Sequence, residues 1–209
     1  MKLKKESIGY VVAFTFVVCM AFVALLAVAN QLTVERVKAN QSFASHFAAL
    51  KAFGLADAST ARDQVESLYA AQVRELAAPS PGVSAYAAKI GENGFVAVKL
   101  TNPGLWGPIT AIVAADPKAE RLRGLEILEQ QETPGLGGRI GEAWFSAQFA
   151  GEKVGADGRI DVAQGSGKGD PDKENSKVDA VTGASRTSDF VESLVAKALD
   201  EIRRIGGAL

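Results

Sequence analysis

An uncharged apolar run near the N-terminus limits the fold of this chain more than any other feature. Residues 8–29, IGYVVAFTFVVCMAFVALLAVA, contain no charged side chain. As an α-helix, which rises about 1.5 Å per residue, the run is long enough to cross a hydrocarbon core roughly 30 Å thick. Lys2, Lys4 and Lys5 precede the run, and Arg36 follows it. This cationic start favours a cytoplasmic N-terminus and an exported remainder.

We interpret the run as a membrane anchor and not as a cleaved signal peptide. Residues 27–29, AVA, resemble a small-residue cleavage site, but the run is longer than the ~7–15 residues of a signal-peptide core. Both interpretations export the rest of the chain. The sequence is divided accordingly into a cytoplasmic N-terminus (1–7), a transmembrane helix (8–30), a helical stalk or linker (31–82) and a folded domain (83–209).

Beyond the run, the hydrophobic spacing predicts helices first and then mostly strands. Residues 59–77 carry apolar side chains at helical spacing, and residues 188–205 place an apolar stripe on a final helix. The remaining elements are strands at 84–90, 95–100, 109–115, 122–128 and 159–163, a short helix at 142–150 and a polar loop at 165–177. This order predicts an α+β fold with an antiparallel sheet and packed helices, preceded by the transmembrane helix and the helical stalk.

Composition removes several kinds of site. The only cysteine is Cys19, inside the apolar run, and the only histidine is His46. A disulfide within the chain is therefore impossible, and neither a zinc site nor an iron–sulfur cluster is expected. A net charge of −1 gives no basis for nucleic-acid binding. We interpret His46 as a surface or packing residue, so redox chemistry in this chain would need an organic cofactor or a partner's centre.

The first motif, DAVTGASRTS, occupies residues 179–188. Its pattern predicts a short strand, a turn of small residues and the start of the last helix. Gly183 and Ala184 leave room for a bulky group near the backbone, and free amides at a helix start favour a phosphate. The same pattern also fits an ordinary helix start that Thr187 or Ser188 caps. The residues alone leave both interpretations open.

A second motif, ETPGLGGRI, occupies residues 132–140. Three glycines and a proline indicate an open loop with exposed amides, which can lie against a flat ring or an anion, although a plain connection also fits. Upstream, GLWGP at 104–108 offers Trp106 as either a core residue or a neighbour of a ligand ring. The glycine-rich stretch at 165–177 is not interpreted as a phosphate loop, because no Ser or Thr follows its first lysine and the glycine spacing differs.

Together these motifs resemble the FMN-binding domain family, which is found in the C subunit of sodium-translocating NADH:quinone reductase and in the G subunit of the Rnf complex. The stretch DxxTGAS at 179–185 resembles the family's flavinylation motif. ETPGLG at 132–137 is similar to its second signature, and GLWG at 104–107 resembles the quinone-reductase branch.

The resemblance implies a role for each matching residue. Ser185 becomes the acceptor of a phosphoester to FMN, at a position where the family usually has threonine, and Thr187 becomes the fallback acceptor. A flavin transferase would recognise Asp179, Gly183 and Ala184. The phosphate would lie against Thr182, and the remaining expected flavin contacts are Glu132, Thr133, Leu136, Gly137, Leu105 and Trp106. No catalytic residue and no metal ligand is implied.

The implied function is electron transfer through covalent FMN in a redox-driven, ion-translocating oxidoreductase complex of the inner membrane. The chain would be a single-pass subunit with its domain on the periplasmic side, without independent turnover. Its implied partners are the other membrane subunits of an Rnf- or NQR-type complex and an exported flavin transferase that uses FAD. Two alternatives remain, a stand-alone exported flavoprotein and a non-redox anchored scaffold. A serine hydrolase is disfavoured, since the motifs lack a partner histidine and a G-x-S-x-G elbow.

Overall fold

A computed structural model describes residues 7–78 and 80–207 of the chain. Lys2, Lys4 and Lys5, on which the predicted membrane orientation depends, lie outside the described residues. The chain divides into two compact units between Ser42 and Phe43.

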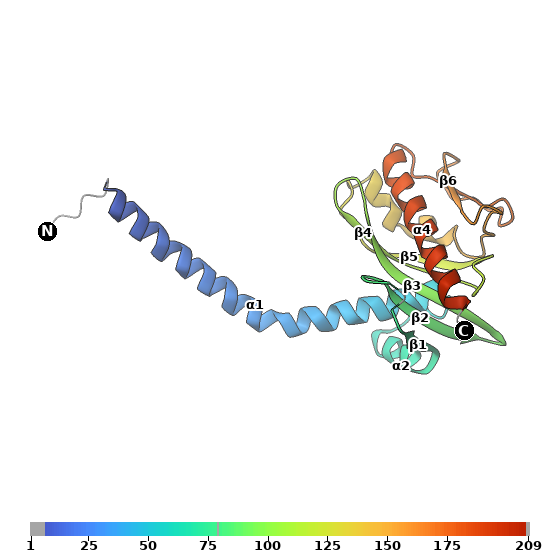
Figure 1. The fold of residues 1–209 in the computed structure, drawn as a ribbon, viewed down its shortest axis with the longest axis horizontal. Helices are drawn as coiled ribbons and strands as arrows, with labels where there is room; N and C mark the ends of the chain where they lie inside the picture. Colours follow the sequence, from blue (N-terminus) through green and yellow to red (C-terminus); the bar gives the residue numbers. More distant parts are fainter. Residues whose placement is uncertain (1–6, 79, 208–209) are drawn as a thin grey trace. The chain divides into compact units, whose positions relative to one another are not determined.

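The first unit is the N-terminal part of one long helix, α1 (Ile8–Ala52) (Figure 1). Large apolar side chains along it are exposed, including Phe14, Phe22 and Leu26. Within the described part of the chain, α1 is the one helix that is long and apolar enough to cross a membrane. The helix continues past residue 30 because no proline or glycine interrupts residues 31–52.

The second unit is built on a five-stranded antiparallel sheet in the order β1-β2-β3-β4-β5 (Figure 1). Its strands are β1 (Val73–Leu76), β2 (Ser84–Ile90), β3 (Asn93–Pro103), β4 (Pro108–Ala115) and β5 (Leu122–Glu129). The predicted α+β class with an antiparallel sheet is confirmed. Four of the predicted strands match β2 to β5 closely, because short apolar runs bounded by turn residues specify them.

Both faces of this sheet are covered. Alternate residues of β4, from Ile109 to Ala115, enter one core together with the last helix, α4 (Ser185–Gly206), and we call this side the α4 face. Ile112 and Ala114 enter a second core with residues 48–53 and α2 (Arg62–Gln72), and we call that side the α1 face. Burial on both sides explains why β4 reads as one continuous apolar run.

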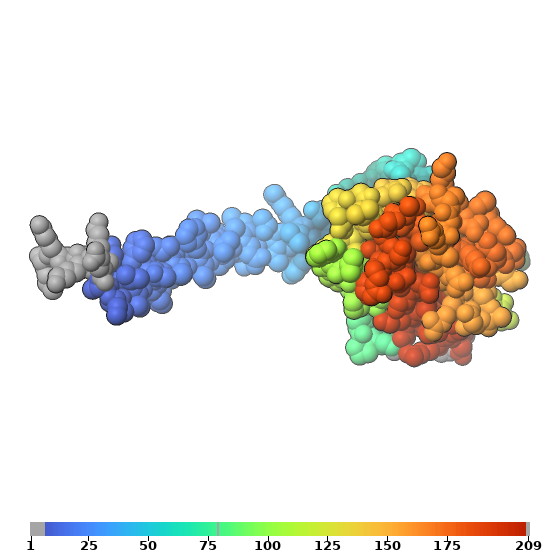
Figure 2. Space-filling model, turned by 90° about the horizontal axis from the view of Figure 1, so that it is seen from above, coloured from blue at the N-terminus to red at the C-terminus, as the bar shows by residue number. Residues whose placement is uncertain are grey.

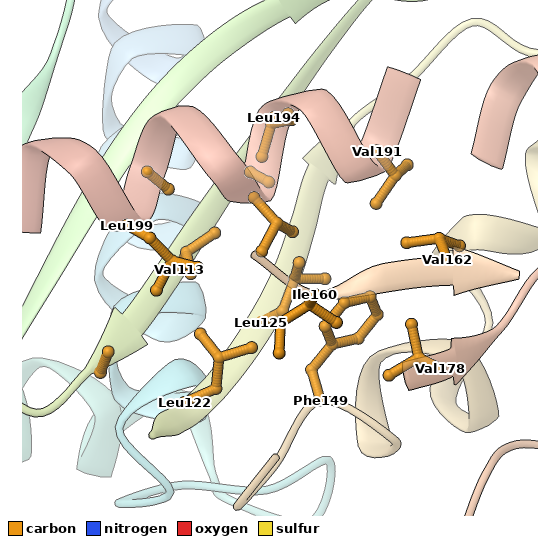
Figure 3. Close-up of a cluster of buried hydrophobic side chains, with 14 of the residues drawn as sticks. Val113, Leu122, Leu125, Phe149, Ile160, Val162, Val178, Val191, Leu194 and Leu199 are labelled. Atoms are coloured by element: carbon orange, nitrogen blue, oxygen red, sulfur yellow. The ribbon is translucent and has the colours of Figure 1, made fainter. Parts of the chain in front are cut away.

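Smaller elements complete the α4 face. These are the 3-10 helix η1 (Gly137–Gly141), α3 (Ala143–Ala147), β6 (Asp161–Ala163) and β7 (Lys177–Asp179). The strands β6 and β7 pair in parallel, and this two-stranded addition was not predicted as a parallel pair. Figure 3 shows how their side chains Val162 and Val178 meet Phe149, Leu125 and Val191 in one apolar core.

The region before the first predicted strand differs from the sequence prediction. The helix predicted at 59–77 ends at Gln72, and the next four residues form β1. Val73 and Leu76 suit either structure, but pairing with Ala88 and Ala85 supplies hydrogen bonds to the edge of β2. The second compact unit begins at Phe43, whereas the sequence predicts a folded domain that starts at residue 83. The reason is that the end of α1 packs against the sheet instead of standing free.

Candidate functional site

The first motif folds as its pattern predicted, into a strand, a turn and a helix start. β7 ends at Asp179, and Ser185 is the first residue of α4. The preceding residue, Ala184, makes no side-chain capping hydrogen bond. In any α-helix the first-turn amides have no partner within the helix, and here no side chain at position 184 caps them. The Ser185 side chain is exposed, and its hydroxyl has no hydrogen-bond partner among residues 7–78 and 80–207.

The capping role considered for Thr187 and Ser188 is wrong, because both residues lie inside α4. Thr187 is 1 % exposed and its hydroxyl donates to Glu132 Oε2 at 2.6 Å. The Ser188 hydroxyl donates to the Ala184 carbonyl at 3.1 Å and accepts from the Val181 amide at 3.2 Å. Burial of Thr187 also makes it a poor fallback acceptor, since a transferase cannot reach its oxygen without opening the helix start.

A cleft of about 310 Å³ opens beside Ser185. Its size is at the lower end of the ~300–1,000 Å³ found for small-molecule sites. It is lined by the predicted residues Leu105, Glu132, Thr133, Leu136, Gly137, Gly183, Ala184 and Ser185, together with Arg186 and Thr187. Three segments far apart in sequence thus meet at one place. Figure 2 shows α4, in red, at the molecular surface beside the yellow segment that contains η1 and α3.

The buried carboxylate of Glu132 joins these three segments. One oxygen, Oε1, accepts from the amides of Leu105 at 2.8 Å and Trp106 at 3.1 Å. The other oxygen accepts from Thr187. Glu132 is only 5 % exposed, so these three donors replace the water that a carboxylate would otherwise need. The side chain therefore shapes the cleft wall and has little surface left for a ligand.

Two glycines permit the close approach of these segments. A Cβ on Gly137 would lie 2.5 Å from Thr187 Oγ1 and 3.0 Å from Glu132 Cβ, so any side chain would push the second motif away from α4. Gly183 has φ +80°, a left-handed conformation that glycine adopts at low cost. The chain can turn sharply there and present Ser185.

Exposed apolar side chains surround the cleft. Among the described residues beyond α1, three large hydrophobic residues are exposed: Leu105 at 49 %, Trp106 at 71 % and Leu136 at 46 %. Leu105 and Trp106 form the tip of the β3–β4 hairpin, and Leu136 stands in the second motif. Gathered exposed apolar surface of this kind marks a site that takes a ligand or a partner. Trp106 is therefore not a core residue, although it does not line the cleft itself.

Besides Trp106, two more predicted site residues lie outside the cleft lining. Thr182 is exposed in the turn, and Asp179 is buried at 8 % exposure. The Asp179 carboxylate faces the glycine-rich loop instead of solvent, and its main chain is bound by the side chain of Gln148. Sequence reasoning missed Gln148. Its only signal was a polar residue between Phe145 and Phe149 in the predicted short helix.

Another carboxylate on the α4 face has very different surroundings. Glu152 is fully buried, and neither of its oxygens has a hydrogen-bond partner in the described part of the chain. Loss of hydration raises the pKa of Glu152 above its ordinary value. The Lys173 ammonium, 4.0 Å away, and the nearby main-chain amides of Ser176 and Lys177, which form no regular hydrogen bond with the carboxylate, oppose part of that rise. No group of three or more His, Cys, Asp or Glu residues that could hold a metal ion occurs within residues 7–78 and 80–207.

Comparison with known proteins supports the resemblance seen in the motifs. Residues 104–200 match the family model of the FMN-binding domain. This segment contains the hairpin tip, the second motif and the first motif. The resemblance to the FMN-binding domain family is therefore confirmed for this part of the chain.

Curated relatives are the C subunits of Na(+)-translocating NADH-quinone reductases. The protein from Neisseria meningitidis is 37 % identical over 102 residues, which cover 49 % of this chain and 39 % of that protein. The protein from Vibrio anguillarum is 36 % identical over 100 residues, covering 46 % and 38 %. The matched segment thus spans well under half the length of these relatives.

Solved structures of such proteins share the fold. The one from Parabacteroides distasonis superposes with a TM-score of 0.64 at 21 % identity, covering 78 % of this chain and 92 % of that one. NqrC from Shewanella oneidensis gives a TM-score of 0.65 at 16 % identity, covering 81 % and 98 %. At these identities the likeness establishes the fold alone.

Proposed function

We propose that this chain, whose residues 104–200 match the FMN-binding domain family, carries FMN esterified through its phosphate to Ser185 and relays electrons with it. One observation carries the proposal. The exposed, unpaired hydroxyl of Ser185 stands at an uncapped helix start, in the same cleft as the second motif and beside exposed apolar side chains.

The residues present fit the two chemically different parts of FMN. The first-turn amides of α4 and the positive end of its helix dipole suit a phosphate next to Ser185. Arg186, which also lines the cleft, adds a positive charge. Leu105 and Leu136 offer apolar surface for a flat ring, and Trp106 is close along the chain to extend it. When bound, FMN supplies one-electron chemistry, which the protein holds and tunes.

Attachment requires Ser185 as a nucleophile only once, during maturation. Ser185 Oγ would form a bond to the flavin-side phosphorus of FAD, and the bond from that phosphorus to the bridging oxygen would break. AMP leaves with that oxygen, and the serine proton passes to a base of the transferase or to water. No oxidant or reductant is consumed. The described part of the cleft offers no histidine, in keeping with a separate transferase that supplies the catalytic groups.

The proposed setting is a membrane complex that couples electron transfer to ion movement. The relatives are named as subunits of Na(+)-translocating NADH-quinone reductases, which favours that type over the Rnf type. The long apolar helix would hold the protein in the inner membrane, with the domain on the periplasmic side. A covalent link suits that location, because a free flavin outside the cytoplasm would be lost on dissociation. The chain would act only together with the other subunits.

The direct test is co-expression of the full chain with a flavin transferase, followed by flavin fluorescence of the denatured band in a gel. The wild-type band should fluoresce, and Ser185→Ala should abolish the signal. Ser185→Thr is the matched variant, since it keeps a hydroxyl at the same position, and its band should still fluoresce. Fluorescence that persists in Ser185→Ala would refute the assigned acceptor. A colourless wild-type chain would leave the scaffold as the better explanation, and a flavinylated chain that purifies without large membrane subunits would favour a stand-alone carrier.

A further inference from the structure

We propose that Asp179 is a positioning residue for the modification of Ser185. Its carboxylate holds the glycine-rich loop 165–169 against the turn that presents Ser185, and it acts through that loop instead of being touched by the transferase. The inference rests on the proposed function for its link to flavin, whereas its structural part can be tested without flavin. It replaces the expectation that the transferase reads the Asp179 side chain.

A single oxygen of Asp179 organises the loop. Oδ2 accepts from the Ser166 hydroxyl at 2.6 Å, from the Gly167 amide at 2.9 Å and from the Gly169 amide at 3.2 Å. Two of the three donors are main-chain groups in a segment without helix or strand partners. Without the carboxylate, these amides would have to find water or another conformation. The loop conformation therefore depends on this one side chain.

The main chain of Asp179 is fixed independently of its side chain. The Gln148 amide donates from Nε2 to the Asp179 carbonyl at 2.9 Å, and Gln148 Oε1 accepts from the Asp179 amide at 2.7 Å. Gln148 is 3 % exposed, so both bonds are protected from water. The same Oε1 accepts from the Asp170 amide at 3.3 Å, at the far end of the loop. Strand β7 is thus a rigid base on which the carboxylate can hold the loop.

The loop lies directly against the turn before Ser185. A Cβ on Gly167 would lie 2.7 Å from the Thr182 hydroxyl oxygen. Lys168 and Thr182 are exposed, whereas Asp179 is not. An enzyme that approaches Ser185 therefore meets the surface of the loop and turn, and Oδ2 of the carboxylate beneath them already accepts from three donors.

The first experiment measures loop order in the full chain in detergent. Trypsin can cleave after Lys168 only when the loop opens, since the amide of the next residue, Gly169, is bound to Asp179. Asp179→Ala should speed this cleavage about tenfold or more, because hydrogen bonds to a charged group are lost. Asp179→Asn keeps one acceptor oxygen and should give a smaller increase, as should Ser166→Ala. Cleavage after Lys118, in the β4–β5 turn, is the internal reference and should not change.

The second experiment measures the initial rate of flavin incorporation by the transferase in the same variants. The rate should fall in the order of loop opening: most for Asp179→Ala, less for Asp179→Asn and least for Ser166→Ala. In the double variant, Ser166→Ala should add nothing to Asp179→Ala, because the two residues act through one contact. Asp161→Ala is the matched control, an exposed acid on the neighbouring strand β6, and it should match the wild type in both measurements.

Two results would overturn the inference. One is an unchanged rate of cleavage after Lys168 in Asp179→Ala, which would show that the carboxylate does not order the loop. The other is equal loss of flavin incorporation in Asp179→Asn and Asp179→Ala together with a fully active Ser166→Ala, which would show direct reading of the charge. If the wild-type chain took up no flavin, the proposed function would fail, and the cleavage rates alone would decide whether Asp179 orders the loop.

Discussion

The two faces of the five-stranded sheet are both closed by apolar packing, but their polar groups are arranged in opposite ways. On the α1 face, polar groups near the surface connect a regular helix to regular strands. Lys51 pairs with Glu126, and Arg123 donates to the carbonyl of Phe53 at 2.8 Å. On the α4 face, the buried carboxylates of Glu132 and Asp179 each accept three hydrogen bonds, mostly from loop amides.

This difference separates two uses of charge. Partly exposed ion pairs contribute little to stability, so the α1 face depends on its apolar contacts. A buried carboxylate that binds loop amides fixes backbone that has no helix or strand partners of its own. The α1 face thus fastens a helix to the sheet, whereas the α4 face gives shape to a cleft. Changes on either face should lower stability, but only changes on the α4 face should also slow flavin incorporation.

The strongest test compares two equal truncations. Phe53→Ala on the α1 face and Phe149→Ala on the α4 face each remove a fully buried ring, and each should lower the free energy of unfolding by about 3–5 kcal/mol. Below both unfolding midpoints, Phe53→Ala should keep the wild-type rate of flavin incorporation. Phe149→Ala should slow it, because Phe149 directly follows Gln148, which holds Asp179. Denaturant unfolding and in-gel flavin fluorescence measure the two effects. Loss of incorporation in folded Phe53→Ala would break the proposed separation of the faces.

A smaller effect is expected from the carboxylate that joins the cleft walls. Glu132→Ala leaves the amides of Leu105 and Trp106 without their acceptor and should cost about 2 kcal/mol, and Thr187→Val about 1 kcal/mol. In a double-mutant cycle of thermal unfolding, the two changes should be coupled, because they share one hydrogen bond. Glu129→Ala, at an exposed position on β5, is the control. Additive effects of the two changes would contradict the contact between Glu132 and Thr187.

The sequence predicts most of the α4 face because its signals are local. Short apolar runs between turn residues specify β2 to β5, and a period of 3.6 specifies α4. All ten residues that line the cleft lie in the two motifs and the hairpin tip, and eight of them were predicted as residues of the flavin site. The motifs themselves contain the features that bring these residues together. Small residues allow the segments to approach closely, and the start of α4 lies beside them.

The remaining features depend on contacts between distant segments. Val73 and Leu76 fit a helix as well as a strand, and only the free edge of β2 makes them β1. Gln148 lies 31 residues from Asp179 and carries no pattern that predicts the pairing. Asp179 stands in a motif that an enzyme is expected to read, yet the loop 165–169 covers its carboxylate. The sequence shows which residue types are present, but their roles depend on burial and on contacts that only the folded structure reveals.

The smallest predicted effect concerns Glu152, the buried carboxylate that lacks the donors of the other two. Burial raises the pKa of Glu152 above its ordinary 4.5 in the folded chain. Between that ordinary value and the raised value, the folded state binds more protons than the unfolded state. Stability should therefore fall as pH rises through this window and stay lower above it.

Glu152→Gln removes the ionisation that causes this loss. At neutral pH the variant should be more stable than the wild type by about 1 kcal/mol, the scale of one poorly satisfied buried polar group. The two proteins should converge below pH 4.5, where the wild-type carboxyl is protonated in both states. Thermal unfolding over a pH series measures the difference. Glu120→Gln is the control, because Glu120 is an exposed acid in the same region, where its main-chain carbonyl accepts from the Val154 amide. A wild type that is the more stable at neutral pH would mean that Lys173 compensates Glu152 fully, and the contrast among the three carboxylates would then disappear.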